Sequence, residues 1–153
     1  MATVAASIAL TQSVHEAETF WYDTETWPRW LDQLGHVVEV SGDWPRAGSE
    51  VTWESGPAGR GTVRERVIEH EALSGQQSEI EDDSITGRQQ VLFTPADDGS
   101  VVQLRLEYRL KRRSPFGALV DVLFIRRLMG ASLVRTLVQF RAALEASRSV
   151  AFE

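Results

Sequence analysis

The run from Val101 to Lys111 alternates, from Val102 onward, between apolar and polar side chains. Successive side chains of a β-strand point to opposite faces, so this run predicts a strand with one buried and one solvated face. Such strands are typical of antiparallel sheets that are covered on one side only. The predicted buried face holds Val102, Leu104, Leu106, Tyr108 and Leu110.

Shorter runs of the same kind fill the middle of the chain and are separated by turn residues such as Gly, Pro and Asp. Runs joined by short turns predict antiparallel neighbours. An additional strand is predicted near the start of the sequence. The predicted strands are Val4–Leu10, Val37–Ser41, Ser49–Ser55, Thr62–Glu71, Gln76–Glu81, Gln89–Thr94 and Val101–Lys111.

Helical signals occur on both sides of these strands. Ser13 and Glu16 have the spacing of a capping box, which predicts a short helix through Tyr22. A second short helix is predicted from Trp27-Pro28 to about Gly35. After the segment "RRSPFG" the period becomes helical again and predicts a long amphipathic helix, with a stripe of Leu133, Leu137, Phe140 and Leu144.

The first part of this long helix, Phe116–Ile125, is apolar almost all round. Such a segment is covered on several sides, lies over a cavity or meets a partner subunit. The sequence leaves open whether it is a gate or an interface, and whether the protein is a monomer or a homodimer.

The composition limits the function classes. The 153 residues predict a single domain, expected over 1–148 with a short tail at 149–153, and without cysteine there is no disulfide or thiolate metal site. The histidines His15, His36 and His70 lack ligand spacing, so neither a metal nor a cofactor is expected. No apolar run of about 18 residues and no leader are present, which predicts a cytoplasmic protein without membrane insertion.

The net charge of −6 is unevenly distributed. Residues 1–110 carry 8 arginines and 19 acids, whereas residues 111–153 carry 8 basic residues and 3 acids. The acidic bulk argues against nucleic acid as a partner, although the basic segment allows a local patch.

These elements, in this order, resemble the START-like or Bet v 1-like (SRPBCC) superfamily, in particular its polyketide cyclase/dehydrase-related branch. The resemblance extends from about Val4 to Glu145 and rests on loose motifs in a fixed order. The matching stretches are Asp23, Pro28 and Trp30 in "DTETWPRW", "AGSEVTW", "VRERVIEHEA", "QQVLFTPADDGSVVQLRLEY" and "LVRTLVQFRAALEA".

The resemblance implies an α+β helix-grip fold, in which a curved antiparallel sheet of about seven strands wraps around a long C-terminal helix. Two short helices after the first strand would cover a ligand cavity between sheet and helix. Trp27 and Trp30 would then lie near the roof of this cavity, where each is either part of the core or part of the pocket wall.

Alternation predicts which side chains face that cavity. In Thr62–Glu71 the apolar Val63 and Val67 set the inward face, which brings Glu65 inward with them. A bulge that turned Glu65 outward to pair with an arginine is the alternative. Tyr108 is either a polar group of the cavity or a core aromatic.

The predicted ligand-binding residues have an inward position on a strand, a place near the roof of the cavity or a place on the long helix near it. They are Trp27, Trp30, Trp53, Glu65, Ser78, Gln89, Val91, Phe93, Leu106, Tyr108, Arg126, Met129 and Leu133.

The expected function is the binding or carriage of a small hydrophobic or aromatic, polyketide- or lipid-like molecule. The alternative is a cyclase or dehydratase in which Glu65 or Tyr108 moves protons. A weaker alternative is a regulatory or membrane-surface protein that uses "KRRSPFGALVDVLF".

Overall fold

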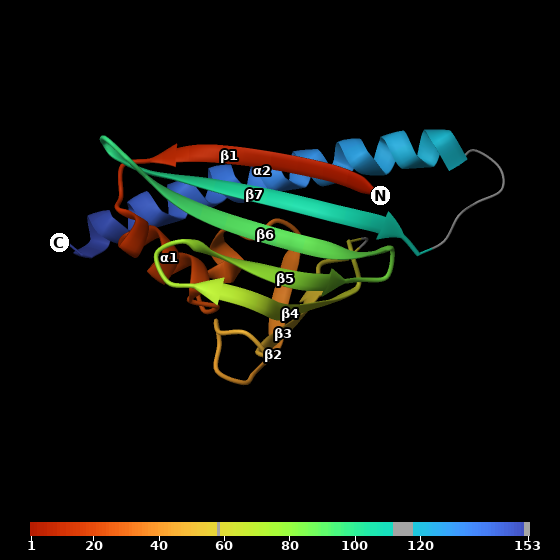
Figure 1. Cartoon of the computed structure of the whole chain (residues 1–153), viewed down its shortest axis with the longest axis horizontal. Coiled ribbons are helices and arrows are strands. Elements are labelled where there is room, and N and C mark those ends of the chain that lie inside the picture. The colour runs from red at the N-terminus through yellow and green to blue at the C-terminus, as the bar shows by residue number, and fades with distance from the viewer. Residues whose placement is uncertain (58, 112–117, 152–153) are drawn as a thin grey trace.

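The computed structural model describes residues 1–57, 59–111 and 118–151 (Figure 1). Its elements follow the predicted order, with short helical segments after the first strand and a long helix at the end. They are β1 (Ala2–Leu10), α1 (Val14–Tyr22), the 3₁₀ turn η1 (Trp27–Arg29), β2 (Leu34–Ser41), β3 (Glu50–Ser55), β4 (Thr62–Glu71), β5 (Gly75–Glu81), β6 (Ile85–Ala96), β7 (Gly99–Leu110) and α2 (Ala118–Ala151).

The described strands form one antiparallel sheet in the order β1-β7-β6-β5-β4-β3-β2. The first strand therefore pairs with the last, with Val4 opposite Leu106. In Figure 1, α2 runs along β1 behind the sheet, and α1 lies near the C-terminal end of α2. This arrangement is the predicted helix-grip fold.

The first helix begins where its capping signal predicts. The Ser13 side chain accepts a hydrogen bond from the Glu16 backbone N–H at 3.2 Å, and α1 runs from Val14 to Tyr22. The cap satisfies one of the N–H groups that a helix leaves free at its first turn.

The second predicted helix is wrong in extent, because only the 3₁₀ turn η1 forms and β2 begins at Leu34. Thr26 precedes η1 but makes no capping bond to it. Its hydroxyl instead donates to backbone carbonyl oxygens, that of Asp23 at 2.7 Å among them, and accepts from the Trp30 indole N–H at 3.0 Å. Gln33 then adopts a φ of 69°, which is incompatible with a continuing helix.

The predicted stripe on the long helix is confirmed, since Leu133, Leu137, Phe140 and Leu144 are all buried. α2 continues to Ala151, past the boundary that the sequence suggested at residue 148. At Gly130 the helix lies close to β1, because a Cβ there would be 3.9 Å from Val4 Cγ1.

Several strands begin earlier than the sequence predicts, most clearly β6, which starts at Ile85 and not at Gln89. The sequence of this extension includes Gly87, which is typical of a turn. In the sheet this glycine lets β6 approach β7, because a Cβ on it would collide with the Glu107 carbonyl oxygen.

Candidate functional site

Alternation along β4 determines where Glu65 points. Val63 and Val67 are 0% and 1% exposed, and Glu65 between them is 7% exposed. The acid is therefore buried on the inner face of the sheet, as predicted. By strand register its neighbours are Val51 on β3 and Ile80 on β5. A carboxyl group in such an apolar setting is costly to ionise.

The pKa of Glu65 reflects this position. Burial raises it from 4.5 to about 7, and the nearby positive charge of Arg60 opposes this rise in part. The Trp53 indole and the Gln89 amide lower the pKa as well. Gln89 Nε2 donates to Glu65 Oε1 at 3.3 Å, whereas the Trp53 N–H faces the carboxyl without completing a hydrogen bond in the described structure. Glu65 is therefore an acid that changes its charge near neutral pH.

Arg60, in the turn between β3 and β4, is held by a buried carboxylate. Its Nε donates to Asp82 Oδ2 at 2.6 Å, and the Asp82 side chain is fully buried. Asp82 Oδ1 also accepts the backbone N–H groups of Ser84 and Ile85. The guanidinium carbon of Arg60 lies 5.6 Å from the ring centroid of Trp53, so the cation is fixed between an anion and an aromatic face.

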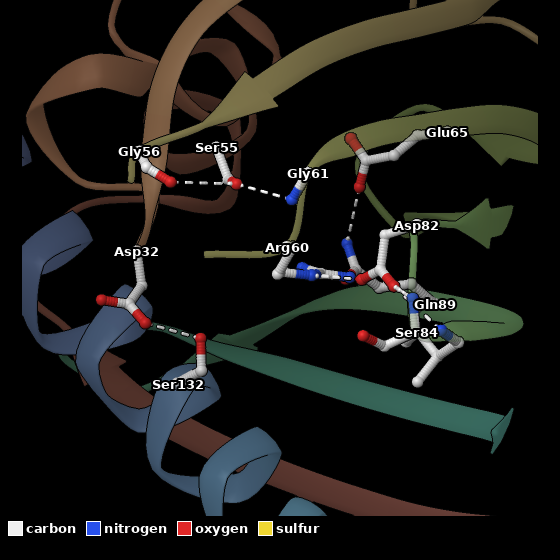
Figure 2. Close-up of polar contacts among 11 residues, drawn as sticks. Asp32, Ser55, Gly56, Arg60, Gly61, Glu65, Asp82, Ser84, Gln89 and Ser132 are labelled. Atoms are coloured by element: carbon white, nitrogen blue, oxygen red, sulfur yellow. Dashed lines mark hydrogen bonds and ion pairs between the residues drawn. The ribbon is translucent and has the colours of Figure 1, made fainter. Parts of the chain in front are cut away.

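These side chains form what we call the Glu65 cluster, which comes from β3, β4, β6 and two turns. Figure 2 shows four of its members close together, with the hydrogen bonds from Arg60 to Asp82 and from Gln89 to Glu65. The cluster consists of Trp53, Arg60, Glu65, Asp82 and Gln89.

Tyr108 lies in the same row of the sheet as Glu65. The register links Glu65 to Ile80, Ile80 to Gly87 and Gly87 to Tyr108. At roughly 4.8 Å per strand, the two backbones are about 14 Å apart. Between them Gly87 adds no side chain to the inner face.

The phenol of Tyr108 is buried, with only 2% of the residue exposed. Burial raises the pKa of this phenol, and the positive charge of Arg126 on α2 lowers it. Arg126 itself is exposed. The helix therefore brings a cation toward the Tyr108 end of the row, and contact of Arg126 with a ligand stays a prediction.

Three buried donor atoms on this part of the inner face find no hydrogen-bond partner among the described residues: Trp53 Nε1, Arg60 Nη2 and Tyr108 Oη. We refer to them as the open donors. Buried polar groups of folded proteins are nearly always paired, so the open donors make this part of the inner face the candidate for contact with a ligand.

The other end of the core is packed with aromatic rings. The Trp30 ring centroid lies 4.6 Å from that of Trp21 and 5.0 Å from that of Phe140. Trp27 lies 5.7 Å from Trp44. We call this the aromatic cluster: Trp21, Tyr22, Trp27, Trp30, Trp44, Phe93 and Phe140.

Hydrogen bonds fix the indoles of this cluster. Trp27 Nε1 donates to the Trp21 carbonyl oxygen at 2.8 Å, and Trp44 Nε1 donates to that of Tyr22 at 2.8 Å. The Tyr22 hydroxyl is the exception, since it is buried and has no partner in the part of the chain that the structure describes. Burial and the charge of Glu18 raise the pKa of this phenol. The structure thus places Trp27 and Trp30 in a packed cluster, and their contact with a ligand stays a prediction.

The remaining predicted site residues lie in or against the core. Ser78, Val91, Phe93, Leu106 and Leu133 are buried, Gln89 is half-buried, and Met129 packs against the core from α2. In β5, Gln76, Ser78 and Ile80 are all buried, so Ser78 points inward, as alternation along the strand predicts.

Sequence reasoning missed Arg60 and Asp82. Asp82 continues the inward series of Gln76, Ser78 and Ile80 by one further step of two, so alternation could have indicated it. Arg60 lies in a glycine-rich turn, and its place depends on an ion pair with a residue that is distant in sequence.

The segment Phe116–Ile125 lies partly outside the described residues, which include the side chains only from 123 onward. In that part Leu123 and Phe124 are exposed, at 58% and 61%, and Leu128 follows them at 48%. These side chains lie away from the core. Whether the segment is a gate or an interface stays a prediction.

The outer face of the sheet carries charges of alternating sign. Register aligns Glu50, Arg66, Glu79, Arg88 and Glu107 in one row across β3 to β7. A hollow of about 550 Å³ lies over this row and is also lined by Arg64 and Arg109. This hollow is on the opposite face of the sheet from Glu65 and is therefore separate from the predicted ligand site.

In the described ranges, His, Asp and Glu side chains form no group of three that could hold a metal ion. Within the same ranges, the helices lack an apolar stretch of the length that a bilayer crossing requires.

A family model described as "Polyketide cyclase / dehydrase and lipid transport" matches residues 1–145. No curated protein sequence matches this chain. Among solved structures, the di-domain ARO/CYC StfQ from the steffimycin biosynthetic pathway superposes with a TM-score of 0.77 at 16% identity, covering 96% of this chain and 51% of StfQ. The chain thus spans about half the length of StfQ.

Two further solved structures match this chain over nearly the whole length of both chains. A START superfamily protein from Mycobacterium smegmatis has a TM-score of 0.75 at 13% identity, covering 94% of this chain and 97% of that one. Ara h 8.0201 has a TM-score of 0.67 at 10% identity, covering 95% and 98%. At these identities the likeness shows the helix-grip fold alone.

Proposed function

Because this chain belongs to the polyketide cyclase/dehydrase and lipid transport family, we propose that it binds a small, mostly apolar organic molecule that carries oxygen atoms. The ligand would lie against the inner face of the sheet, with its polar part at the Glu65 cluster. The observation that carries this proposal is the set of open donors on an inner face that also holds buried apolar side chains.

The surroundings of the open donors support an apolar body for the ligand. Val51, Ile80 and Leu106 lie on the same inner face and are at most 2% exposed. Ligand sites of this kind combine a hydrophobic lining with a few convergent polar groups that fix orientation.

A second candidate is catalysis of a cyclase or dehydratase type. It is favoured by Glu65, whose pKa of about 7 suits an acid or base at neutral pH. Tyr108, in the same row, would be the second proton-carrying group. Binding is the leading proposal because it needs only the donors, whereas catalysis also needs a substrate that loses or gains a proton between them.

Binding is tested with a naphthalene-sized fluorophore. It should bind one to one and quench tryptophan emission, because Trp53 belongs to the site. Leu133→Trp should reduce the affinity by adding volume to the core from α2, and Arg88→Gln on the outer face is the matched control. Loss of binding in the Arg88 variant with unchanged binding in the Leu133 variant would assign the ligand to the outer hollow and contradict the proposal.

Catalysis is tested on the molecule that native mass spectrometry recovers with the purified protein. An enzyme should change the mass of this molecule or of its precursor, and Glu65→Gln should slow the change by roughly 100-fold while binding persists. A recovered molecule that stays unchanged during long incubation with the wild-type protein would leave binding as the function.

A further inference from the structure

We infer that the Glu65 cluster recognises a neutral carbonyl oxygen, and that Glu65 meets this oxygen as a carboxylic acid, so that ligand binding takes up a proton. The inference rests on the proposed function and names the chemistry of its ligand.

The open donors determine the hydrogen-bonding character of the ligand group. The indole N–H of Trp53 and the guanidinium N–H groups of Arg60 donate and cannot accept. A ligand atom that satisfies both must therefore be an acceptor, and an oxygen is the usual one. A hydroxyl group could also accept, but its hydrogen would then require an acceptor of its own.

The charges of the cluster favour a neutral acceptor over an anion. Asp82 already neutralises Arg60 at 2.6 Å, and its side chain is 0% exposed. An anionic ligand would add a second negative charge beside this pair with no further cation in the cluster. Burying such an uncompensated charge is costly.

Other charged groups do not alter this balance. Arg126 acts on Tyr108, at the far end of the row, and is exposed to solvent. On the β4 and β5 strands themselves, the neighbouring charges Arg64, Arg66, Glu79 and Glu81 belong to the outer face. Within the described cluster the titratable neighbours of Glu65 are thus Arg60 and Asp82, which neutralise each other.

Glu65 completes the donor set when it is protonated. Its carboxylic acid O–H can donate to a carbonyl oxygen, whereas its carboxylate would repel that oxygen and compete for Trp53 and Arg60. A carbonyl ligand therefore selects the protonated form. With a pKa of about 7, the affinity should be constant well below pH 7 and fall about tenfold per pH unit above it.

The test uses three probes of similar size: 2-acetylnaphthalene, 2-isopropenylnaphthalene and 2-naphthoate. The first has a carbonyl oxygen, the second replaces it with a methylene group, and the third is an anion. At pH 6, quenching of tryptophan emission should show the ketone binding about tenfold more tightly than the alkene, and the carboxylate binding least tightly. At pH 8.5 the ketone should have lost this advantage, whereas the alkene should be unaffected.

Two further measurements isolate the proton. Calorimetry of ketone binding near pH 7.5, in buffers of different ionisation enthalpy, should show net proton uptake in the wild-type protein. Glu65→Gln retains a donor without a titrating proton, so its ketone affinity should be the same at pH 6 and pH 8.5. Glu79→Gln, on the outward side of β5, is the matched control and should keep the wild-type pH dependence.

Equal affinities for ketone and alkene at pH 6, with no proton uptake, would overturn the inference and leave the proposed function intact. Tightest binding of 2-naphthoate would overturn it in favour of an anion site. If none of the three probes binds to the wild-type protein, the proposed function fails as well. This result is obtained without any substituted protein.

Discussion

Trp30 and Trp53 are equally buried, each 1% exposed, but their indole nitrogens are in opposite situations. Trp30 Nε1 donates to the Thr26 hydroxyl at 3.0 Å, within an aromatic cluster whose rings contact one another. Trp53 Nε1 is an open donor beside an acid and a cation. One end of the core therefore pairs its buried indole, whereas the other leaves buried polar groups unpaired at a cost in stability.

The largest expected effect is a loss of stability from a substitution in the aromatic cluster. Trp30→Ala should lower the free energy of unfolding by about 3 to 5 kcal/mol, because it removes a ring that contacts Trp21 and Phe140 and leaves a cavity. Urea unfolding followed by circular dichroism measures this. A loss below about 1 kcal/mol would show that the aromatic cluster is not the stable part of the core.

Glu65→Gln, in contrast, should raise the free energy of unfolding at high pH. Its pKa of about 7 in the folded protein exceeds the ordinary 4.5, so the folded state holds a proton that the unfolded state releases between these values. Stability from this group is therefore greatest below pH 4.5, falls as pH rises to about 7, and then stays low.

Replacing the acid removes this cost. At pH 8 the variant should be more stable than wild type by about 3 kcal/mol, and at pH 4.5 nearly equal to it. Denaturant titrations at both pH values test the difference, with Glu79→Gln as control. A variant that loses stability at pH 8 would show that the carboxylate is well accommodated.

A matched pair of substitutions compares the two indoles directly. In Trp30→Phe the Thr26 hydroxyl loses the indole N–H that donates to it. In Trp53→Phe the lost indole N–H has no partner in the described structure. Both shrink the ring by the same amount, so the Trp30 variant should lose about 1 kcal/mol more stability than the Trp53 variant. Equal losses in thermal and urea unfolding would mean that the hydrogen-bonding states of the two indoles are alike in solution.

The smallest effect is expected outside both regions. Phe124 is 61% exposed, so Phe124→Ser should change the free energy of unfolding by less than about 0.5 kcal/mol. Sedimentation of the variant, beside wild type at high micromolar concentration, reports whether the residue belongs to a subunit interface. A large loss of stability together with dissociation would favour the interface.

Much of the sheet was predictable because alternation is a local signal. Val63 and Val67 place Glu65 inward, and Tyr108 follows from the apolar residues on either side of it. The predicted strand Thr62–Glu71 agrees with β4 at both ends. The family resemblance added how the strands and the long helix are assembled, which periodicity alone does not specify.

The errors occur where tertiary contacts decide. The helix predicted from Trp27 shortens to η1, and the chain turns at Gln33, with a φ of 69°, before β2 begins. β2 contains register shifts after Leu34 and Val37, so simple alternation does not describe it. Arg60 could not be placed because its partner Asp82 is brought to it only by the paired strands.

The pairing of β1 with β7 also bears on how the chain is synthesised. Val4 meets Leu106, so β1 leaves the ribosome well before its partner exists, by a delay on the order of 5 to 20 seconds. The hairpins from β2 to β6 can form meanwhile from neighbouring segments, whereas β1 waits with its backbone unpaired. Closure of the sheet by β1 and β7 is therefore the late, non-local step of folding, and the nascent chain is most open to chaperones and to aggregation before it.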